Sequence, residues 1–209
     1  MKPLNKVKIE WSPSFAYAIG LIATDGYLSV DRRHITMTSK DLEQIESFKR
    51  CLAIQNRIGR KSRAFGQEKR YYYVHLGDRV FYDFLLSIGL TPAKSKTLKR
   101  LRVPDEYFVD FLRGCIDGDG NINIFWHSES RHPQLRVRLS SASIKFLEWI
   151  RREVSKKLDI KGGWLERSQR CWALAYGKAD SVRLLNFLYY RGVCSYLMRK
   201  YWIAKPFLN

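Results

Sequence analysis

The fold of this chain is decided by two nine-residue stretches, AIGLIATDG at residues 18–26 and LRGCIDGDG at residues 112–120. In each stretch a glycine, Gly20 or Gly114, precedes two apolar residues. An acid lies five residues after that glycine, and a second glycine follows the acid directly. Glycine inside a helix costs about 1 kcal/mol relative to alanine, so its use at the same place in two helices needs a reason. We predict that Gly20 faces Gly114, with the two helix backbones almost in contact.

The same register brings two acids together. Asp25 and Asp119 lie 94 residues apart, as the two motif glycines do. A carboxylate is unfavourable at the negative end of a helix dipole, and two neighbouring carboxylates also repel each other. A cation is therefore expected between them, and Mg²⁺, which prefers oxygen ligands and contacts phosphate, is the natural candidate. The trailing Gly26 and Gly120 suit a left-handed C-terminal cap.

Two simpler explanations of these stretches exist. Asp-Gly most often makes a turn after a helix, which explains one copy but not two copies behind matched glycines. Residues 117–121 open like an EF-hand calcium loop, which needs glycine at its sixth position and glutamate at its twelfth. Those positions hold Ile122 and Ser128, so a calcium loop is excluded.

One order of elements, α-β-β-α-β-β-α, repeats around the two motifs. In the first half hydrophobic periodicity predicts helices at residues 13–24, 40–53 and 78–88, and strand pairs at 27–30 with 34–38 and 57–64 with 70–76. In the second half it predicts helices at 105–116, 143–158, 178–190 and 195–204, and strand pairs at 121–127 with 134–140 and 164–166 with 171–176. The recurrence indicates a duplication, with the basic segment 91–104 linking the halves.

Several strands carry polar and cationic side chains on one face only. In residues 134–140 the even positions are polar and the odd ones apolar, and residues 34–38 and 121–127 alternate in the same way. An ordinary solvated face explains any single strand. Arg, Asn, Gln and His repeated on one face in both halves favour a surface that reads DNA bases, since these side chains make bidentate contacts to base edges. The candidate DNA-binding residues are His34, Thr36, Arg70, Tyr73, His75, Asn121, Asn123, His127, Gln134, Arg136 and Arg138.

The composition supports a polyanionic partner. The chain has 209 residues, with 38 Lys and Arg against 20 Asp and Glu, a net charge of +18. Apolar residues make up 45%, enough for a real core, so this is not a disordered basic tail. The charge is spread over both halves, which favours nucleic acid over an anionic membrane.

Other features exclude further classes. No apolar stretch approaches the roughly 20 residues of a membrane span, and the first ten residues do not resemble a secretory signal, so we expect an intracellular protein. The cysteines form no CxxC pair and are expected to be reduced core residues. The four histidines complete no zinc spacing.

Both nine-residue stretches resemble the LAGLIDADG motif, and the pair resembles a single-chain, two-motif LAGLIDADG homing endonuclease of the intron-encoded kind. The second motif fits well, whereas the first departs from the pattern at Ala18-Ile19 and Ala23. The resemblance covers nearly the whole chain. It implies an α+β fold of two pseudo-symmetric halves, residues 1–104 and 105–209, with saddle-shaped antiparallel sheets on DNA, packed through the two motif helices.

The resemblance also implies an activity: metal-dependent hydrolysis of both strands of a DNA target site of roughly 20 bp, by a monomer that initiates intron homing. The acids that bind the catalytic metals in the family correspond to Asp25 and Asp119. Basic residues that follow the last strand-helix unit of each half correspond to Lys94, Lys96, Arg199 and Lys200, of which Lys94 and Lys200 are the catalytic candidates.

Two non-nuclease alternatives share this fold. One is an RNA-splicing maturase, whose partner would be intron RNA, and the other is a non-catalytic DNA-binding module. Loss of one motif acid would favour either of them. Both acids are present, so a nuclease is the leading hypothesis.

Overall fold

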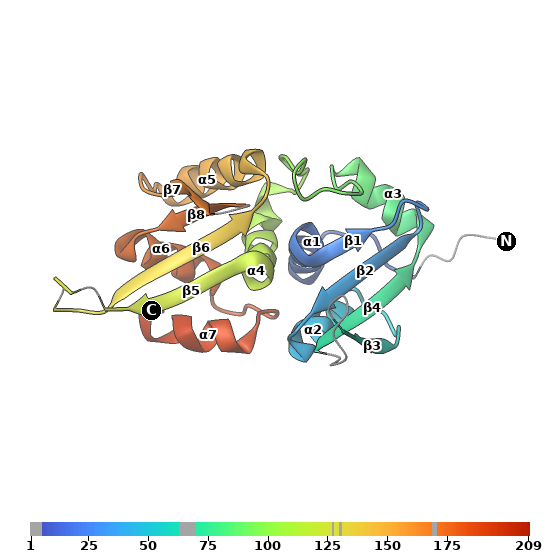
Figure 1. Cartoon of the computed structure of the whole chain (residues 1–209), viewed down its shortest axis with the longest axis horizontal. Coiled ribbons are helices and arrows are strands. Elements are labelled where there is room, and N and C mark those ends of the chain that lie inside the picture. Colours follow the sequence, from blue (N-terminus) through green and yellow to red (C-terminus); the bar gives the residue numbers. More distant parts are fainter. Residues whose placement is uncertain (1–5, 63–69, 127, 130, 169–170) are drawn as a thin grey trace.

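The computed structural model describes residues 6–62, 70–126, 128–129, 131–168 and 171–209 of the chain. Two halves, each built on a four-stranded antiparallel sheet, lie on either side of a central pair of helices (Figure 1). The predicted α+β class and the predicted pseudo-symmetry of the halves are confirmed.

In the first half the central helix is α1 (Pro13–Asp25), and Ser12 caps it by accepting a hydrogen bond from the Phe15 amide. The elements that follow are β1 (Gly26–Leu28), β2 (His34–Ser39), α2 (Leu42–Cys51), β3 (Ile58–Lys61), β4 (Tyr71–Gly77) and α3 (Arg79–Ser87). The loop expected around Gly66 lies outside the described residues.

The second half repeats this order. A 3₁₀ turn, η1 (Asp105–Tyr107), leads into the central helix α4 (Phe108–Asp119). The elements that follow are β5 (Gly120–Phe125), β6 (Gln134–Ser141), α5 (Ile144–Leu158), β7 (Trp164–Ser168), β8 (Cys171–Tyr176), α6 (Lys178–Leu188), α7 (Met198–Ala204) and a final turn η2 (Lys205–Phe207).

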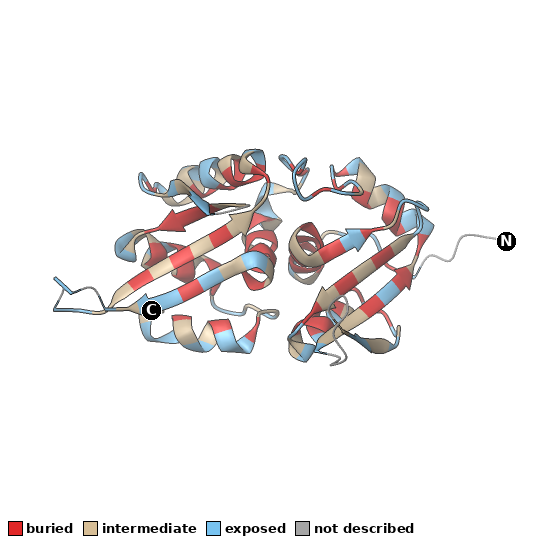
Figure 2. Ribbon diagram, viewed as in Figure 1, coloured by how far each residue is buried: buried red, intermediate tan, exposed pale blue. Residues whose placement is uncertain are grey.

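The two sheets have the same topology. Their strand orders are β1-β2-β4-β3 and β5-β6-β8-β7, with every pairing antiparallel. Alternate residues of β2 and β6 are buried, which gives the banded strands of Figure 2. One face of each sheet therefore packs on helices and contributes to the core, and the other face stays open.

Three expectations need correction. The second motif helix continues through Asp119 instead of ending near residue 116, because Gly120 still donates its amide hydrogen bond to Ile116 O. Helix α7 begins at Met198 instead of residue 195, because residues 193–197 are not helical and Leu197, its N-cap, has an extended backbone (φ −90°, ψ 115°). Among the four cysteines, which are all free thiols, only Cys115 is buried.

Of the helices that the structure describes, none combines the length and apolar composition that a membrane crossing requires.

Candidate active site and DNA-binding surface

The site is built on the crossing of α1 and α4, where two glycines remove the side chains that would separate the helices. A Cβ on Gly20 would lie 2.2 Å from Phe111 O and 2.9 Å from Gly114 Cα. A Cβ on Gly114 would lie 2.2 Å from Tyr17 O and 3.1 Å from Gly20 Cα. Since real Cβ atoms do not approach backbone this closely, only glycine fits at either position.

The glycine at the end of each motif helix does not form the left-handed cap that the sequence suggested. Gly26 (φ −78°) and Gly120 (φ −89°) have extended backbones, so neither forms the predicted left-handed cap. A Cβ on Gly26 would lie 2.7 Å from Ile22 Cα, and one on Gly120 would lie 2.4 Å from Ile116 O. Each glycine lets the chain turn sharply from the helix into the first strand of its sheet.

This turn leaves Asp25 and Asp119 beside each other at the ends of α1 and α4. Asp25 Oδ2 lies so close to the backbone of Gly118 that a Cβ there would be 2.7 Å from it. Burial raises the pKa of Asp25 to about 7, and the neighbouring Asp119 charge adds to the shift. Asp119 keeps more solvent contact, yet burial also raises its pKa. The protein thus holds two carboxylates where negative charge is unfavourable.

Two buried lysines partly compensate this charge, and each contacts the end of the motif helix of its own half. Lys94 donates a hydrogen bond to Gly26 O. Lys200 donates to Ile116 O (2.5 Å), Asp117 O (2.9 Å) and Gly120 O (2.7 Å). These carbonyls are the negative ends of the helices, where a cation is stabilised.

The lysines act on the acids across the pseudo-symmetry axis. Lys200 lowers the pKa of Asp25 more than Lys94 does, whereas Lys94 has the larger effect on the pKa of Asp119. Burial lowers the pKa of both lysines to about 8. Each acid is therefore influenced most by the lysine of the opposite half.

The acids suit a divalent cation. Within the described ranges, no group of three or more His, Cys, Asp and Glu side chains forms a metal site. The side-chain ligands available to a cation at the helix ends are therefore the two carboxylates of Asp25 and Asp119. Mg²⁺ is commonly held by one or two carboxylates together with water and substrate phosphates. Two crowded carboxylates with raised pKa values are the donor set that such an ion would stabilise.

Asp117, the other acid of the second motif, points away from this pair. It is 1% exposed, and its Oδ2 accepts hydrogen bonds from Tyr17 OH and Leu197 N, both at 2.8 Å. Burial raises its pKa to about 6. Its counterpart in the first motif is the buried Ala23, so this contact exists in one half only.

A buried network around Asp117 was not predicted from the sequence. Gln44 donates from α2 to Asp117 O (3.0 Å). The fully buried Arg113 donates to Ser195 O (2.6 Å), Leu188 O (2.8 Å) and Asp110 Oδ1 (2.5 Å). The feature of the sequence that could have indicated this network is Arg113, a charged residue inside an otherwise apolar part of the motif.

Four predicted residues of the first half lie together on its open sheet face. The His34 and His75 rings stack with centroids 4.7 Å apart, and Thr36 Oγ1 lies 2.8 Å from His75 Nδ1. Tyr73 pairs with Thr38 on the same face. A Cβ on Gly59 would be 2.5 Å from the Tyr73 ring, so this ring rests on the bare backbone of β3. The resulting face is aromatic, and Lys61 lies over the Tyr73 ring, 5.8 Å from its centroid.

The open face of the second half is more strongly charged. Asn121 pairs with Arg138, and Asn123 pairs with Arg136. Arg136 lies over the Phe125 and Trp164 rings, 5.0 and 5.5 Å from their centroids. Gln134 opposes Phe125 at the far end of the same strand pair.

Arg138 is held by neighbours that the sequence did not single out. It forms an ion pair with Glu166, whose other oxygen accepts a hydrogen bond from Trp164 Nε1 at 3.1 Å. The arginine is therefore fixed on this face before any ligand binds.

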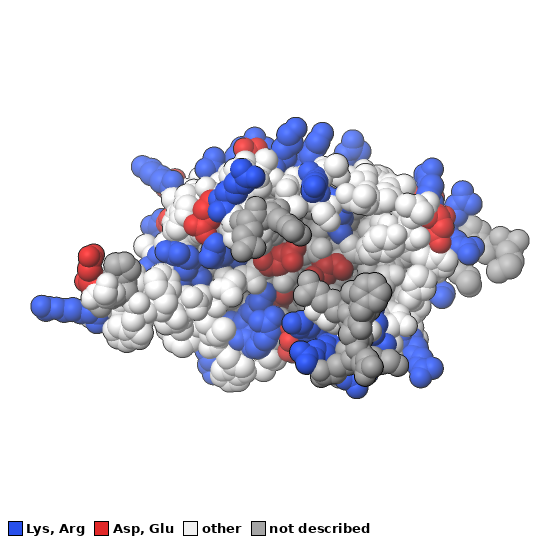
Figure 3. Space-filling model, viewed as in Figure 1, with Lys and Arg blue, Asp and Glu red and all other residues white. Residues whose placement is uncertain are grey.

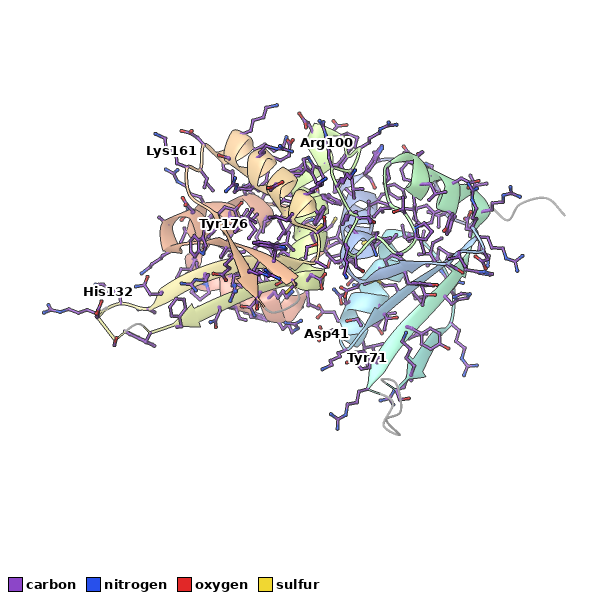
Figure 4. The ribbon with its side chains drawn as sticks, turned by 45° about the horizontal axis from the view of Figure 1, so that its top comes forward. Asp41, Tyr71, Arg100, His132, Lys161 and Tyr176 are labelled. Atoms are coloured by element: carbon purple, nitrogen blue, oxygen red, sulfur yellow. The ribbon has the colours of Figure 1, made fainter. Side chains whose placement is uncertain are left out.

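The remaining predicted residues lie elsewhere. Arg70 is exposed just before β4, and His127 lies outside the described residues. Lys96 is exposed on the linker. Arg199 forms an ion pair with Asp41 (3.0 Å), which Figure 4 places where the two halves meet.

The surface charge follows this arrangement. In Figure 3 acidic side chains gather at the centre of one face, between the two halves. Lys and Arg lie around them, and the strands of the first half are largely white.

Comparison with known proteins agrees with this architecture. Residues 12–89 match the family model of a LAGLIDADG-like domain. The comparison with curated proteins gives no match.

Solved structures share the fold over most of the chain. The homing endonuclease I-WcaI bound to its DNA recognition sequence superposes with a TM-score of 0.66 at 12% identity, covering 92% of this chain and 86% of that one. I-DmoI in complex with DNA and Mn gives 0.55 at 13% identity, covering 88% and 98%.

A second kind of protein shares the fold too. The N-terminal LAGLIDADG domain of DUF199/WhiA gives a TM-score of 0.57 at 16% identity, covering 92% of this chain and 88% of that one. This chain spans only 63% of full-length DUF199/WhiA from Thermatoga maritima. The chain therefore resembles a LAGLIDADG-like domain over residues 12–89, and as a whole it shares the fold of the homing endonucleases I-WcaI and I-DmoI.

Proposed function

We propose that this chain is a site-specific DNA endonuclease that makes a double-strand break in a long duplex target and thereby initiates intron homing. The observation that carries the proposal is the matched pair of helix ends, each with one acid, Asp25 or Asp119, and one buried lysine, Lys94 or Lys200. A pair of equivalent acid and lysine sets is what the hydrolysis of two strands requires.

Asp25 and Asp119 are proposed to hold divalent cations, with Mg²⁺ the natural one. When bound, such a cation supplies Lewis-acid stabilisation of the phosphoryl oxygens and lowers the pKa of a bound water. The fixed positive charges of Lys94 and Lys200 favour the negative charge that develops on the phosphate in the transition state. Because three backbone carbonyls accept from Lys200, it acts through its charge more than through a free donor.

The open sheet faces are proposed to bind the two halves of the target. His34, Thr36, Tyr73 and His75 would contact one half-site, and Asn121, Asn123, Gln134, Arg136 and Arg138 the other. Arg70 and His127 complete this proposed set. The net charge of +18 supplies the attraction to the phosphate backbone.

The working unit is proposed to be an intracellular monomer whose two domains, residues 1–104 and 105–209, are related by the internal pseudo-symmetry. In this arrangement both acid and lysine sets are supplied by one chain.

A non-catalytic DNA-binding module is the second candidate. The structural similarity to the N-terminal LAGLIDADG domain of DUF199/WhiA, over 92% of this chain, is the observation behind it. A maturase with intron RNA as its partner is a further form of this alternative.

One experiment separates these candidates. The purified chain is incubated, with Mg²⁺ or with EDTA, with duplex DNA of the uninterrupted gene that spans the insertion site of its own intron. We expect double-strand cleavage only with Mg²⁺, and none by Asp25→Asn or Asp119→Asn. Tight, sequence-specific binding without cleavage of this DNA in any divalent cation would support the binding module instead.

A further inference from the structure

The helix that carries Lys200 is held at its first turn by two carboxylates from different parts of the chain. Leu197 N, at the cap of α7, donates to Asp117 Oδ2 at 2.8 Å. Met198 N donates to Glu43 Oε1 at 3.1 Å, with Oε2 at 3.3 Å. Asp117 belongs to α4 of the same half, and Glu43 belongs to α2 of the other half.

These two acids fix where Lys200 lies. Lys200 is only two residues beyond Met198, and it is 3% exposed with its ammonium on the end of α4. The backbone carbonyl of Asp117 also accepts a hydrogen bond from Lys200 Nζ at 2.9 Å, a contact that does not involve the carboxylate. Tyr17 OH, at 2.8 Å, holds the Asp117 carboxylate in place.

The segment before α7 is anchored in the same region. Arg113 donates hydrogen bonds to Leu188 O, at the end of α6, and to Ser195 O, three residues before α7 begins. Cys51 Sγ of α2 lies 3.2 Å from Ser195 Oγ. The connection therefore reaches α7 over a surface built from both halves.

Lys94 has a different setting. It lies in a turn segment outside any helix, and the registers of Asp117 and Arg113 are occupied in the first motif by Ala23 and Ile19. The two lysines thus occupy equivalent places at the helix ends but are held there by different means.

We infer that Asp117 and Glu43 are positioning residues for Lys200, and that they support the cleavage of one DNA strand more than the other. This inference rests on the proposed endonuclease function. Neither residue is expected to touch DNA or metal. Both hold the first turn of α7, and the charge of Asp117 also raises the pKa of Lys200, which makes Glu43 the residue that acts through α7 alone.

The first test measures each strand separately. A duplex target labelled on both strands is cut by the wild type, and Lys200→Met identifies the strand that depends on Lys200. We expect Asp117→Ala and Glu43→Ala to slow that strand by about 10- to 100-fold, the usual effect of losing a supporting hydrogen bond at a reactive site. The other strand should change by less than about threefold.

Two control variants accompany the cleavage test. Lys94→Met should slow the opposite strand, and Glu46→Ala, an exposed acid on the same helix as Glu43, should leave both rates unchanged. Equal slowing of both strands by Asp117→Ala and Glu43→Ala, or slowing of the Lys94-dependent strand, would overturn the inference.

The second test needs no cleavage. Lysine acetylation by acetic anhydride, read by mass spectrometry, reports the accessibility of each amine. We expect Lys200 to react at least about fivefold faster in Glu43→Ala and Asp117→Ala, with Lys94 unchanged, since loosening α7 exposes a buried amine. Unchanged Lys200 labelling in both variants would overturn the inference.

The two tests also separate this inference from the proposed function. If the wild type cuts neither strand, the endonuclease proposal fails, while the labelling still decides whether these acids hold Lys200. Glu43 is half-buried at the surface, so its variant is expected to fold even if Asp117→Ala does not. Asp117→Asn, which keeps an oxygen able to accept both hydrogen bonds, should then show a weaker form of the same effect.

Discussion

Gly20 and Gly114 face each other so closely that a Cβ on either would lie 2.2 Å from a backbone carbonyl oxygen of the opposite helix. Because backbone cannot move aside as the end of a side chain can, Gly20→Ala and Gly114→Ala should push α1 and α4 apart. We expect a loss of about 3 kcal/mol in the free energy of unfolding, the upper part of the range for overpacked cores, measured by chemical denaturation.

Gly177→Ala is the matched control for these variants. Gly177 has a negative φ of −70°, and a Cβ there would have no atom within 4 Å. Because Gly177 is the N-cap of α6, where glycine is preferred to alanine, its stability should fall by about 1 kcal/mol or less. Wild-type stability in Gly20→Ala would show that the helices do not cross as described.

The second prediction concerns Asp25 and Asp119. In metal-free buffer, Asp25→Asn and Asp119→Asn should each raise the melting temperature, because each removes one of two crowded carboxylates whose burial and mutual repulsion raise the pKa of Asp25. Both variants should still bind DNA but lose double-strand cleavage, since an amide is a poor ligand for Mg²⁺. Scanning calorimetry, a binding assay and a cleavage assay test the three parts.

Asp117→Asn serves as the comparison and should lose much less cleavage activity. Both described hydrogen bonds of Asp117 end on one oxygen, which an asparagine can reproduce. An inactive Asp117→Asn beside an active Asp119→Asn would mean that the assigned acid register is wrong by two residues.

Gly118 gives the third prediction. A Cβ there would be 2.0 Å from Thr24 Oγ1 and 2.7 Å from Asp25 Oδ2. The Thr24 hydroxyl is already engaged with Gly20 O and Leu21 O of its own helix. Gly118→Ala should therefore displace Asp25 and lower the cleavage rate by about 100-fold, as small misplacements of reacting groups do. DNA affinity should stay within about threefold, and an unchanged cleavage rate would contradict this account of the site.

The parts of the site that the sequence could predict are those that repeat. Equal spacing from Gly20 and Gly114 identified Asp25 and Asp119 as a pair, and alternation along residues 134–140 identified the open face of β6. These signals are local, and each is a direct consequence of helix or strand geometry.

The rest depends on contacts between distant segments. Asp117 and Leu197 are joined across 80 residues, and Glu43 and Met198 across 155. Residues 189–197 have no periodicity that would predict their path. The role of Gly118 follows from the opposite helix, and the extended backbone of Gly26 follows from the strand that starts there, so neither has a signature of its own.

The fourth prediction is a steep salt dependence of DNA binding. If on the order of ten phosphates are neutralised, the logarithm of the binding constant should fall against the logarithm of the salt concentration with a slope of about −9. Titrations at several NaCl concentrations measure it. A slope shallower than about −3 would contradict an interface that follows the DNA backbone along both sheets.

The last prediction concerns base reading by Arg138. This side chain is fixed on the open face by Glu166, which Trp164 Nε1 holds in turn. Arginine pairs with guanine O6 and N7 in the major groove, and a carboxylate accepts from cytosine N4, so this ion pair suits one G·C pair. Arg138→Ala should cost about 1–3 kcal/mol for the cognate duplex and remove discrimination at one position of the second half-site. Binding to duplexes that each carry one substituted base pair measures this.

Arg151 provides the control for that series. It is an equally cationic, exposed residue, but it lies on α5, which packs on the opposite face of the same sheet. Arg151→Ala should leave the pattern of base preference unchanged. If Arg138→Ala instead weakened binding equally for every substituted duplex, with discrimination intact at each position, Arg138 would be a phosphate contact, and base reading in this half would fall to Arg136 and the two asparagines of β5.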